Sequence, residues 1–424
     1  MPSAFCAEKL VELHIPGSQV TRLWDGVQDL VNLKKIDLSK CKQLVELPDL
    51  SRATNLEEIN ISDCEVLCQL HPSILSSPAL EYLMLYGCKE LKSFKGEIRS
   101  KSLRRLDFDG CSSLEEFSVS SGQLTSLTFK SSGIRSLGNE LCCLTSLEEL
   151  ALSDCRELTE LPHNVKALSR LQILTVSGSS SLRSIPELPL SIGEVHVTDC
   201  TSLETIFSLK EESFLRRISF MNCMRLDEES RNIIMEDAHL TILKKILLIS
   251  AENSHLWDSH EFNRRFSCDV CYPGSKVAEW FKCRTTEGAS ITVEIDEPYN
   301  QLLGFCVSCA VSQEFSPYYS VYCEYDLGDG EKYPLGTYYL NELRGRWNTD
   351  HVCLWFHPFY DSRIKNNIER CVGRDDHGNT WNKTILFIFT AEGLESRMDD
   401  FFIKGCGVSP IYLSDVLHLI PNWN

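Results

Sequence analysis

Apolar residues recur through the first half of the chain in one fixed pattern, which can be written L-x-x-L-x-L-x-x-C. One copy of the pattern consists of Leu33, Ile36, Leu38 and Cys41. Copies begin at residues 10, 33, 56, 80, 103, 124, 147, 171, 192 and 215, so successive copies are 21 to 24 residues apart. A period of this length over ten copies indicates a stack of similar structural units.

Each copy predicts one short parallel strand whose central apolar residues point into a core shared with the neighbouring copies. The chain then turns at the Cys position, where a small, buried and weakly donating side chain fits beneath the backbone. Three copies carry Ser18, Ser132 or Ser179 there instead, and Ser can donate as well. The pattern predicts an α/β leucine-rich-repeat solenoid of about ten repeats over residues 1–226. It also assigns seven of the 20 cysteines to the core.

The repeat pattern ends after Leu226. Acidic residues at 227–229 followed by an apolar run to Ile249 predict a helix that closes the open end of the repeats, so residues 227–266 are interpreted as a capping helix and connection. Residues 267–424 alternate strand-like segments with turn signals such as Gly328-Asp329-Gly330. They predict a mostly-β sandwich of the jelly-roll or immunoglobulin-like kind, with strands at Ile291–Ile295, Leu302–Val311, Tyr319–Tyr325, Val352–Phe356 and Thr384–Phe389.

The repeat register also predicts which side chains face outward on the concave strand face. Most of these positions carry charges of both signs, which is typical of a solvated surface. One rung differs, because Tyr82, Met84 and Tyr86 lie beside the Arg-rich next copy. Aromatic, Met and Arg side chains are enriched at protein interfaces. The predicted protein-binding residues are Tyr82, Met84, Tyr86, Arg104, Arg105, Asp107 and Asp109, with sandwich loops at 312–318 and 357–378 as further contributors.

Charge and targeting signals narrow the function classes. The formal net charge of -18 argues against a nucleic-acid partner or an anionic membrane, both of which require clustered Lys and Arg. Residues 1–226 carry a net charge of -6 and residues 227–424 carry -12, so a basic partner would favour the second half. The N-terminus lacks the apolar segment of a signal peptide, and no run reaches the roughly 18 apolar residues of a membrane span. We therefore expect an intracellular protein whose thiols are reduced.

Two cysteine patterns raise the question of a metal or a catalytic thiol. Cys268-x-x-Cys271 and Cys306-x-x-Cys309 have a spacing that zinc sites use. Residues three apart in a strand point to opposite faces, however, so core thiols are the favoured interpretation. Cys353 between His351 and His357 could suggest a thiol nucleophile, but an alternating core strand is the simpler interpretation. The sequence thus predicts no catalytic residue, no metal and no cofactor.

Several segments taken together carry a family resemblance. The opening repeat contains Leu23-Trp24-Asp25-Gly26-Val27-Gln28, and Ile185-Pro186-Glu187-Leu188-Pro189 lies near the end of the repeats. The second half contains Val270-Cys271-Tyr272-Pro273-Gly274-Ser275 and then Glu279-Trp280-Phe281. These segments resemble the repeats and the post-repeat β-sandwich of plant TIR, nucleotide-binding, leucine-rich-repeat disease-resistance proteins. Trp280 and Phe281 are interpreted as core anchors of the sandwich rather than contact residues.

The resemblance implies that the repeats and the sandwich recognise a pathogen effector protein in a defence response, in the cytoplasm or the nucleus. In the family, recognition releases a nucleotide-driven assembly in which TIR domains cleave NAD. The present sequence lacks Gly-x-x-x-x-Gly-Lys-Ser/Thr, and nine residues precede the first repeat. We therefore expect a non-enzymatic chain that is either the C-terminal portion of a longer receptor or a truncated receptor-like protein.

Two alternative functions remain open at this stage. The repeats could bind a receptor nucleotide-binding domain and act as an autoinhibitory, decoy or regulatory protein. A repeat-type substrate adaptor or ligase is a more distant alternative, because it would need an F-box or a catalytic Cys domain, and neither is recognisable in the sequence.

Overall fold

The computed structural model describes residues 7–207, 215–251, 268–295, 301–312, 320–328, 330–339, 349–358, 384–392, 397–398 and 403–417. Its contacts divide the chain into two compact units, Met1–Leu209 and Lys210–Asn424. Nine of the ten predicted repeats lie in the first unit, and the strand of the tenth lies in the second.

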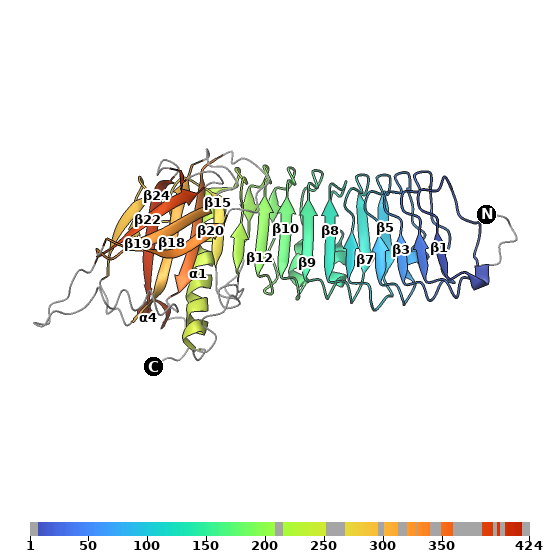
Figure 1. The fold of residues 1–424 in the computed structure, drawn as a ribbon, viewed down its shortest axis with the longest axis horizontal. Helices are drawn as coiled ribbons and strands as arrows, with labels where there is room; N and C mark the ends of the chain where they lie inside the picture. Colours follow the sequence, from blue (N-terminus) through green and yellow to red (C-terminus); the bar gives the residue numbers. More distant parts are fainter. Residues whose placement is uncertain are drawn as a thin grey trace, which may run out of the picture. The chain divides into compact units, whose positions relative to one another are not determined.

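The first unit is the predicted leucine-rich-repeat solenoid (Figure 1). Each repeat contributes one strand, which begins two residues after the first apolar residue of the pattern. These strands are β1 (Glu12–His14), β2 (Lys35–Asp37), β3 (Glu58–Asn60), β4 (Tyr82–Met84), β6 (Arg105–Asp107), β8 (Ser126–Lys130), β9 (Glu149–Ser153), β10 (Ile173–Ser177) and β12 (Glu194–Thr198). Where they pair they are parallel, and the second residue of each strand is buried, as the repeat pattern predicts.

The return segments between these strands also follow the sequence pattern. Apolar residues such as Leu44, Leu47, Leu158 and Leu161 are buried in them. In the described residues of this unit the helical component consists of 3-10 turns, not α-helices. The return elements are η1 (Ala7–Lys9), η2 (Pro72–Leu75), η3 (Asn139–Cys143), η4 (His163–Ala167), and the short strands β5 (Ser93–Glu97), β7 (Glu116–Ser120), β11 (Ser184–Ile185) and β13 (Thr205–Ile206).

A left-handed residue ends the strand segment of every repeat. The residue immediately before the Cys position has a positive φ in all ten copies, from Gly17 (67°) to Asn222 (56°). In the first eight repeats its N–H donates to a backbone carbonyl of the next repeat over 2.6 to 2.9 Å, as Lys40 does to Ser62. The turn therefore reverses the chain and joins adjacent repeats in one step.

The repeat cysteines lie directly beneath this turn. Cys64 donates its thiol proton to the Leu38 carbonyl oxygen (3.2 Å), and Cys88 donates to that of Ile61 (3.2 Å). Each bond reaches into the preceding repeat. The seven cysteines of the pattern are all fully buried. The prediction of a small buried donor is thereby confirmed for the cysteines, whereas the buried Ser179 hydroxyl makes no such bond.

The second unit contains two sheets that face one another. The first sheet has the order β14 (Arg217–Ser219), β15 (Asp269–Pro273), β21 (His351–Pro358), β18 (Leu302–Val311), β24 (Ile403–Tyr412) and β16 (Cys283–Arg284). The second has the order β17 (Ser290–Glu294), β22 (Thr384–Glu392), β19 (Ser320–Asp326) and β20 (Lys332–Tyr339), with β23 (Arg397–Met398) paired to β22.

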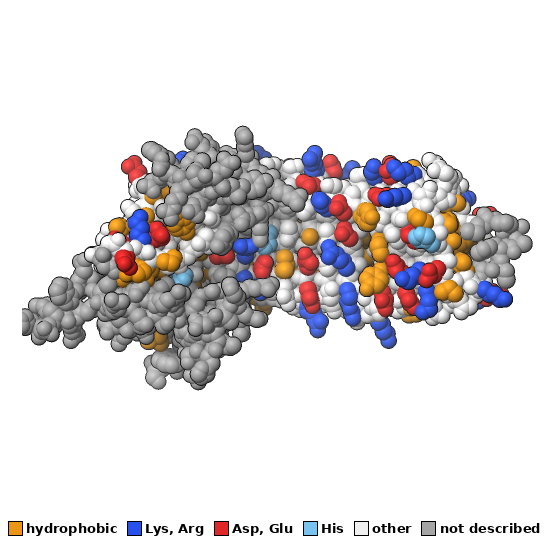
Figure 2. Space-filling view, viewed as in Figure 1, with side chains coloured by type: hydrophobic (Ala, Val, Ile, Leu, Met, Phe, Trp, Pro, Cys, Tyr) orange, Lys and Arg blue, Asp and Glu red, His pale blue; other side chains and the backbone are white. Residues whose placement is uncertain are grey.

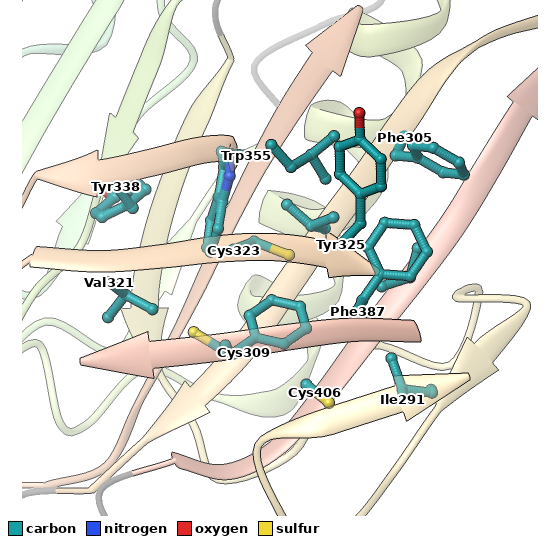
Figure 3. Close-up of a cluster of buried hydrophobic side chains, with 14 of the residues drawn as sticks. Ile291, Phe305, Cys309, Val321, Cys323, Tyr325, Tyr338, Trp355, Phe387 and Cys406 are labelled. Atoms are coloured by element: carbon teal, nitrogen blue, oxygen red, sulfur yellow. The ribbon is translucent and has the colours of Figure 1, made fainter. Parts of the chain in front are cut away.

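One apolar core lies between the two sheets (Figure 3). Phe305 and Trp355 enter it from the first sheet, and Tyr325 and Phe387 enter it from the second. The rings of Phe305 and Phe387 meet edge to face, with centroids 4.8 Å apart. The predicted strand-rich sandwich is confirmed.

A helix is present where the sequence predicts one. Helix α1 (Glu228–Ala251) follows Asp227, whose carboxylate accepts a hydrogen bond from the Ser230 N–H (2.7 Å) and so caps the first turn. The short helix α4 (Leu413–Leu417) follows β24. The capping role of residues 227–266 and the domain limits at 226 and 266 stay predictions.

The last repeat is completed by the sandwich itself. Strand β15 pairs parallel with β14, the Asp269 N–H donates to the Arg216 carbonyl (3.0 Å), and the Phe220 N–H donates to that of Cys271 (2.8 Å). These bonds reproduce the contacts that one repeat makes with the next. At the turn, the left-handed Asn222 donates its N–H to Nε2 of His351 (3.0 Å). An imidazole thus stands where the next repeat's carbonyl would be.

The protonation state of His351 follows from these contacts. Its Nδ1 lies 2.9 Å from the Thr349 carbonyl oxygen, which can only accept, so Nδ1 carries the proton. Nε2 then remains an acceptor for Asn222. Burial lowers the pKa of His351 from 6.5 to about 4, which keeps the ring neutral.

The turn residues give a first prediction. Lys40 holds a φ of 60°, which costs a side-chain-bearing residue roughly 1 kcal/mol. We expect Lys40→Gly to raise the free energy of unfolding by about that amount in a urea titration. Gly87→Ala should instead lower the free energy of unfolding, because a Cβ there would lie 2.4 Å from Oδ1 of Asp63. Equal stability of both variants and the parent chain would contradict the role of the turn.

His351 gives a second prediction. Its pKa is lower in the folded chain than in the unfolded one, so the unfolded chain binds the proton more readily. The contribution of neutral His351 to the free energy of unfolding is complete above pH 6.5 and is lost as pH falls toward about 4. The whole contribution amounts to about 3 kcal/mol. Comparing urea unfolding of the parent chain and His351→Gln from pH 7 to 4 isolates this contribution from other titrating groups. A difference between the two that does not change with pH would exclude it.

Candidate functional site

The structure places six of the seven predicted contact residues around one groove. The groove has a volume of about 470 Å³ and lies between β4 and β6. Tyr82 and Tyr86 are 58% and 47% exposed. The predicted residues in its lining are Tyr82, Met84, Tyr86, Arg104, Arg105 and Asp107. Asp109 does not line the groove, and its carboxylate lies 3.7 Å from Nζ of Lys130.

The parallel ladder of the solenoid is interrupted at this groove. Strands β1 to β4 form one sheet, and β6, β8, β9, β10 and β12 belong to another. Among the described residues, no backbone hydrogen bond joins β4 to β6. The two repeats are still joined at the turn, where the Gly87 N–H donates to the Asp109 carbonyl (2.7 Å). The groove is therefore an opening in the sheet that is closed at one end.

The core beneath the opening changes character at the same place. The second inward residue of the repeat is Leu38, Ile61 or Leu85 in the three repeats before the opening, and Phe108 or Phe129 in the two repeats directly after it. Phe108 contacts Phe94 edge to face with ring centroids 5.0 Å apart, and it stacks on Phe129 at 5.2 Å. Phe117 contacts the same rings, and these four aromatic side chains need more room than aliphatic ones. We attribute the separation of β4 and β6 to this wider core.

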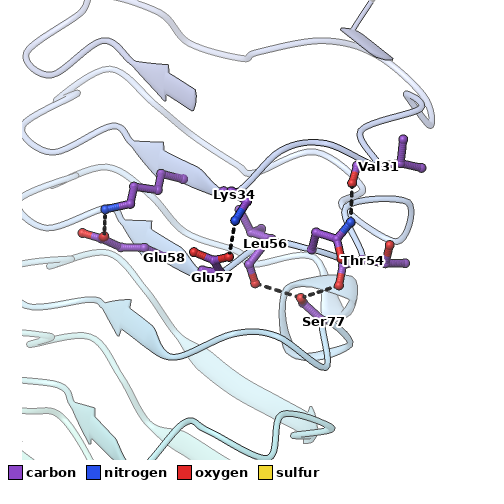
Figure 4. Close-up of polar contacts among 9 residues, drawn as sticks. Val31, Lys34, Thr54, Leu56, Glu57, Glu58 and Ser77 are labelled. Carbon is purple, nitrogen blue, oxygen red and sulfur yellow. Dashed lines mark hydrogen bonds and ion pairs between the residues drawn. The ribbon is translucent and has the colours of Figure 1, made fainter. Parts of the chain in front are cut away.

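Charges on the strand face before the opening are paired from one repeat to the next (Figure 4). Nζ of Lys34 lies 2.8 Å from Glu57, and Nζ of Lys35 lies 3.1 Å from Glu58. Figure 2 shows acidic and basic side chains alternating along the solenoid, with separate hydrophobic patches between them. The Tyr82 rung interrupts this series with exposed aromatic surface.

The two arginines at the groove are held differently. Arg104 donates from Nη1 to the backbone oxygen (2.9 Å) and side-chain oxygen (2.6 Å) of Gln123. Arg105 Nη2 lies 3.9 Å from Oδ2 of Asp107, and 64% of its side chain is exposed. An ion pair that long and that exposed contributes little. Arg105 can therefore turn toward a partner at low cost.

Sequence reasoning missed part of this site. Glu81, Leu83, Leu85 and Ser102 also line the groove. The interruption of the ladder was not predicted, because the step from residue 80 to 103 is as regular as the others. The change from Leu85 to Phe108 at equivalent positions is the signal that could have indicated it. The predicted loop contributors at 312–318 and 357–378 lie outside the described residues except for Ser312, His357 and Pro358.

The CxxC pairs are split between the two faces of one sheet. Cys271 and Cys309 lie in the sandwich core, whereas Cys268 and Cys306 lie outside that core. This confirms that residues three apart in a strand do not share a face. In the described parts of the chain, no group of three or more His, Cys, Asp and Glu side chains is placed to hold a metal ion.

The Cys/His pair is not arranged for nucleophilic catalysis. Cys353 Sγ lies 3.7 Å from Sγ of Cys271 within the core, and Nε2 of His351 accepts from Asn222. Both residues of the pair are thus engaged elsewhere, as the core interpretation predicts. Phe281 is buried, which confirms it as a core residue. Trp280 is half-buried and stacks on Phe281 with ring centroids 4.1 Å apart.

The fold and its repeat pattern define a leucine-rich-repeat protein. A family model described as Leucine Rich Repeat matches residues 9–28. None of the helices in the described segments is both long enough and apolar enough to cross a membrane.

The chain is homologous to plant disease-resistance proteins, which confirms the resemblance seen in its motifs. It is 30% identical over 432 residues to Disease resistance protein RML1B of Arabidopsis thaliana, covering 96% of this chain and 37% of that protein. It is 25% identical to Disease resistance protein RPS4B of the same plant, covering 98% of this chain and 39% of that protein. The chain therefore spans less than two fifths of the length of these relatives.

A solved structure is also similar, at greater distance. The leucine-rich repeat domain of the type III effector XopL is 19% identical, with a TM-score of 0.35, covering 52% of this chain and 71% of that one. A similarity this low supports no inference about the present chain.

Thiol reactivity gives a third prediction. Burial raises the pKa of Cys64 to about 12, so its reactive thiolate is scarce near neutral pH, whereas Cys143 is exposed. We expect N-ethylmaleimide to modify Cys143 in the folded chain while Cys64 and Cys353 stay unmodified, as read by peptide mass mapping. The same reaction in 8 M urea, a condition chosen to unfold the chain, should modify all three and serves as the control. Early modification of Cys353 would contradict its place in the core.

Proposed function

We propose that this chain is the protein-recognition part of a plant intracellular immune receptor and that it senses a pathogen effector protein. The observation that carries the proposal is the groove between β4 and β6, where Tyr82, Tyr86 and Arg105 are exposed on an otherwise charge-paired strand face. Solenoid strand faces suit large protein partners, and these residue types supply most binding energy at interfaces.

The homology supports the defence role. The relatives are named for disease resistance, and the match covers nearly all of this chain. The chain spans less than two fifths of their length, and we place signalling after recognition in the segments of such relatives that it does not match. Binding energy gained at the groove would bias an equilibrium between inactive and active states in those segments.

Recognition without catalysis is the mechanism we propose, and the environment of the thiols supports it. All 18 described cysteines are free, which suits a reducing compartment such as the cytoplasm or the nucleus. The alternative partner is a receptor nucleotide-binding domain, held by the same face in an autoinhibitory, decoy or regulatory role.

A binding experiment tests the proposal. Purified full-length chain is measured by biolayer interferometry against a panel of pathogen effector proteins and against a receptor nucleotide-binding domain. For a partner that binds, we expect Tyr82→Ala combined with Arg104→Ala to weaken the affinity about 10- to 100-fold, because exposed aromatic and Arg residues dominate interface energies. Glu148→Ala, an exposed change on the same face in another repeat, is the matched control.

The outcomes separate the two partners. Binding of an effector that depends on Tyr82 and Arg104 supports the proposed function. Binding of the nucleotide-binding domain alone, with the same dependence, would replace it by the regulatory alternative. Affinity that is unchanged in the double variant would remove the groove from the interface.

A further inference from the structure

Four cysteines lie side by side in a row across the first sheet of the sandwich. Cys353 of β21 lies directly opposite both Cys271 of β15 and Cys309 of β18. Cys309 lies in turn opposite Cys406 of β24. All four side chains are fully buried in the core between the two sheets, where Figure 3 shows Cys309 and Cys406. The register of three strand pairs thus brings four free thiols together, and we call this set the thiol row.

Main-chain hydrogen bonds divide the thiol row into pairs. Opposite residues of an antiparallel ladder alternate between pairs that exchange main-chain hydrogen bonds and pairs that do not, and side chains lie closer in the second kind. The Cys271 carbonyl accepts from the Phe220 N–H (2.8 Å), which lies on the β14 side. The main-chain groups of Cys271 therefore point away from β21. Cys271 and Cys353 consequently form a pair of the closer kind.

Cys309 and Cys406 form a second pair of this kind. The Cys406 carbonyl accepts from the Thr285 N–H (2.8 Å), and the Cys406 N–H donates to Oγ1 of Thr285 (3.2 Å). Both main-chain groups of Cys406 thus point away from β18. Because the two kinds alternate, the central contact between Cys353 and Cys309 is of the wider, hydrogen-bonded kind.

The two outer pairs have the separation that a disulfide requires. Opposite residues of the closer kind have Cα atoms about 4.5 Å apart, inside the range of roughly 4.4 to 6.8 Å found in disulfides. Sγ of Cys271 lies 3.7 Å from Sγ of Cys353. Side-chain rotation can bring two such sulfur atoms to bonding distance while the strands keep their register. Two outer bonds use all four thiols, whereas a central bond would leave Cys271 and Cys406 separated by two strands.

Burial decides when the thiol row can react. It raises the pKa of the Cys271 and Cys309 thiols, so their reactive thiolates are scarce while the sandwich is closed. The core also excludes bulky reagents. We therefore expect reaction with a small neutral oxidant such as hydrogen peroxide, at a rate that follows how often the strands separate.

We propose that the thiol row is an oxidation site at which hydrogen peroxide forms two cross-strand disulfides, one between Cys271 and Cys353 and one between Cys309 and Cys406. In each pair, one sulfur attacks a peroxide oxygen, the O–O bond breaks, and a sulfenic acid and one water form. The facing thiol then attacks that sulfur, the S–O bond breaks, and a second water leaves. Each pair loses two hydrogen atoms, and one peroxide molecule is reduced to two waters.

The two disulfides fix the sandwich in its closed form. One joins β15 to β21, the other joins β18 to β24, and the ladder between β21 and β18 connects the two. Strand β15 also pairs with β14 of the final repeat. Separation of the strands in the presence of peroxide is therefore followed by covalent closure of the sheet, which a dithiol reductant reverses.

Disulfide mapping of the full chain tests the site. The reduced chain is treated with millimolar hydrogen peroxide in buffer, in urea below the unfolding transition, and in 8 M urea. Remaining thiols are then blocked with N-ethylmaleimide in 8 M urea, and unreduced peptides are identified by mass spectrometry. We expect the two proposed linkages to dominate in the folded chain and to form faster in dilute urea. In 8 M urea all cysteines compete, and mixed linkages should result.

Thermal unfolding gives an independent measurement. Each disulfide closes a long loop of the unfolded chain, from residue 271 to 353 or from 309 to 406. We expect the oxidised chain to unfold at least about 5 °C above the same sample after reduction with dithiothreitol.

Variants of the thiol row supply the matched comparison. Cys353→Ala should abolish the first linkage and retain the second, and Cys406→Ala should do the reverse. Cys323→Ala is the control, because Cys323 is buried in the same core but lies opposite Phe389 of β22. This variant should retain both linkages.

Three results would overturn the proposal. One is a thiol row that stays reduced in dilute urea while the exposed Cys143 is oxidised. Another is a set of linkages in the folded chain as mixed as that in 8 M urea. The third is a dominant bond between Cys353 and Cys309, which would contradict the pairing that the main-chain hydrogen bonds indicate.

Discussion

The rest of the structure depends on the hydrogen bond that the left-handed residue of each of the first eight repeats donates to the repeat after it. Lys40 and Gly87 both make it, although one carries a side chain that disfavours the required φ. The bond reverses the chain, sets the spacing between repeats and creates the buried space that the cysteine occupies. Because a thiol proton from that cysteine is donated to the preceding repeat, the backbone and the side chain of one turn tie together three consecutive repeats. A stack built in this way gains its stability from neighbour contacts, not from any single repeat.

That same bond explains how the solenoid tolerates an opening in its sheet. Between β4 and β6 the ladder is absent among the described residues, yet the Gly87 N–H still reaches the Asp109 carbonyl, and Cys111 still donates to the Leu85 carbonyl (3.3 Å). The turn side of the repeats is intact, and the strand side is free to separate. Where Phe108 and its aromatic neighbours widen the core, the separation is taken up at the strand face. In this interpretation, wider packing in the core of the solenoid produces the groove on its strand face.

Most of the repeat architecture could be predicted because its defining residues recur at a nearly fixed spacing along the chain. Leucine, cysteine and the residue before the cysteine recur at positions that only one register satisfies, and the outward residues follow from that register. The opening at β4 could not be predicted, because it depends on how the Phe94 and Phe108 rings share volume across repeats that are regular in sequence. In the sandwich, β18 was found at the predicted residues, whereas β20 was not predicted, since Pro334 and Gly336 interrupt its pattern. The contact of His351 with Asn222 joins residues that are 129 positions apart, and no local pattern encodes it.

The junction at β14 has a consequence for how such proteins can change. In the part of the chain that the structure describes, β15 of the sandwich pairs with β14 of the final repeat, and His351 accepts from Asn222 of the same repeat. These contacts come from residues of the final repeat and of the sandwich, so duplication or loss of a repeat further upstream leaves them chemically unchanged. The length of the solenoid and the identity of its exposed rungs can therefore diverge between gene copies without a compensating change in the sandwich. The exposed strand face of the repeats is in this way uncoupled from the part of the chain that terminates them.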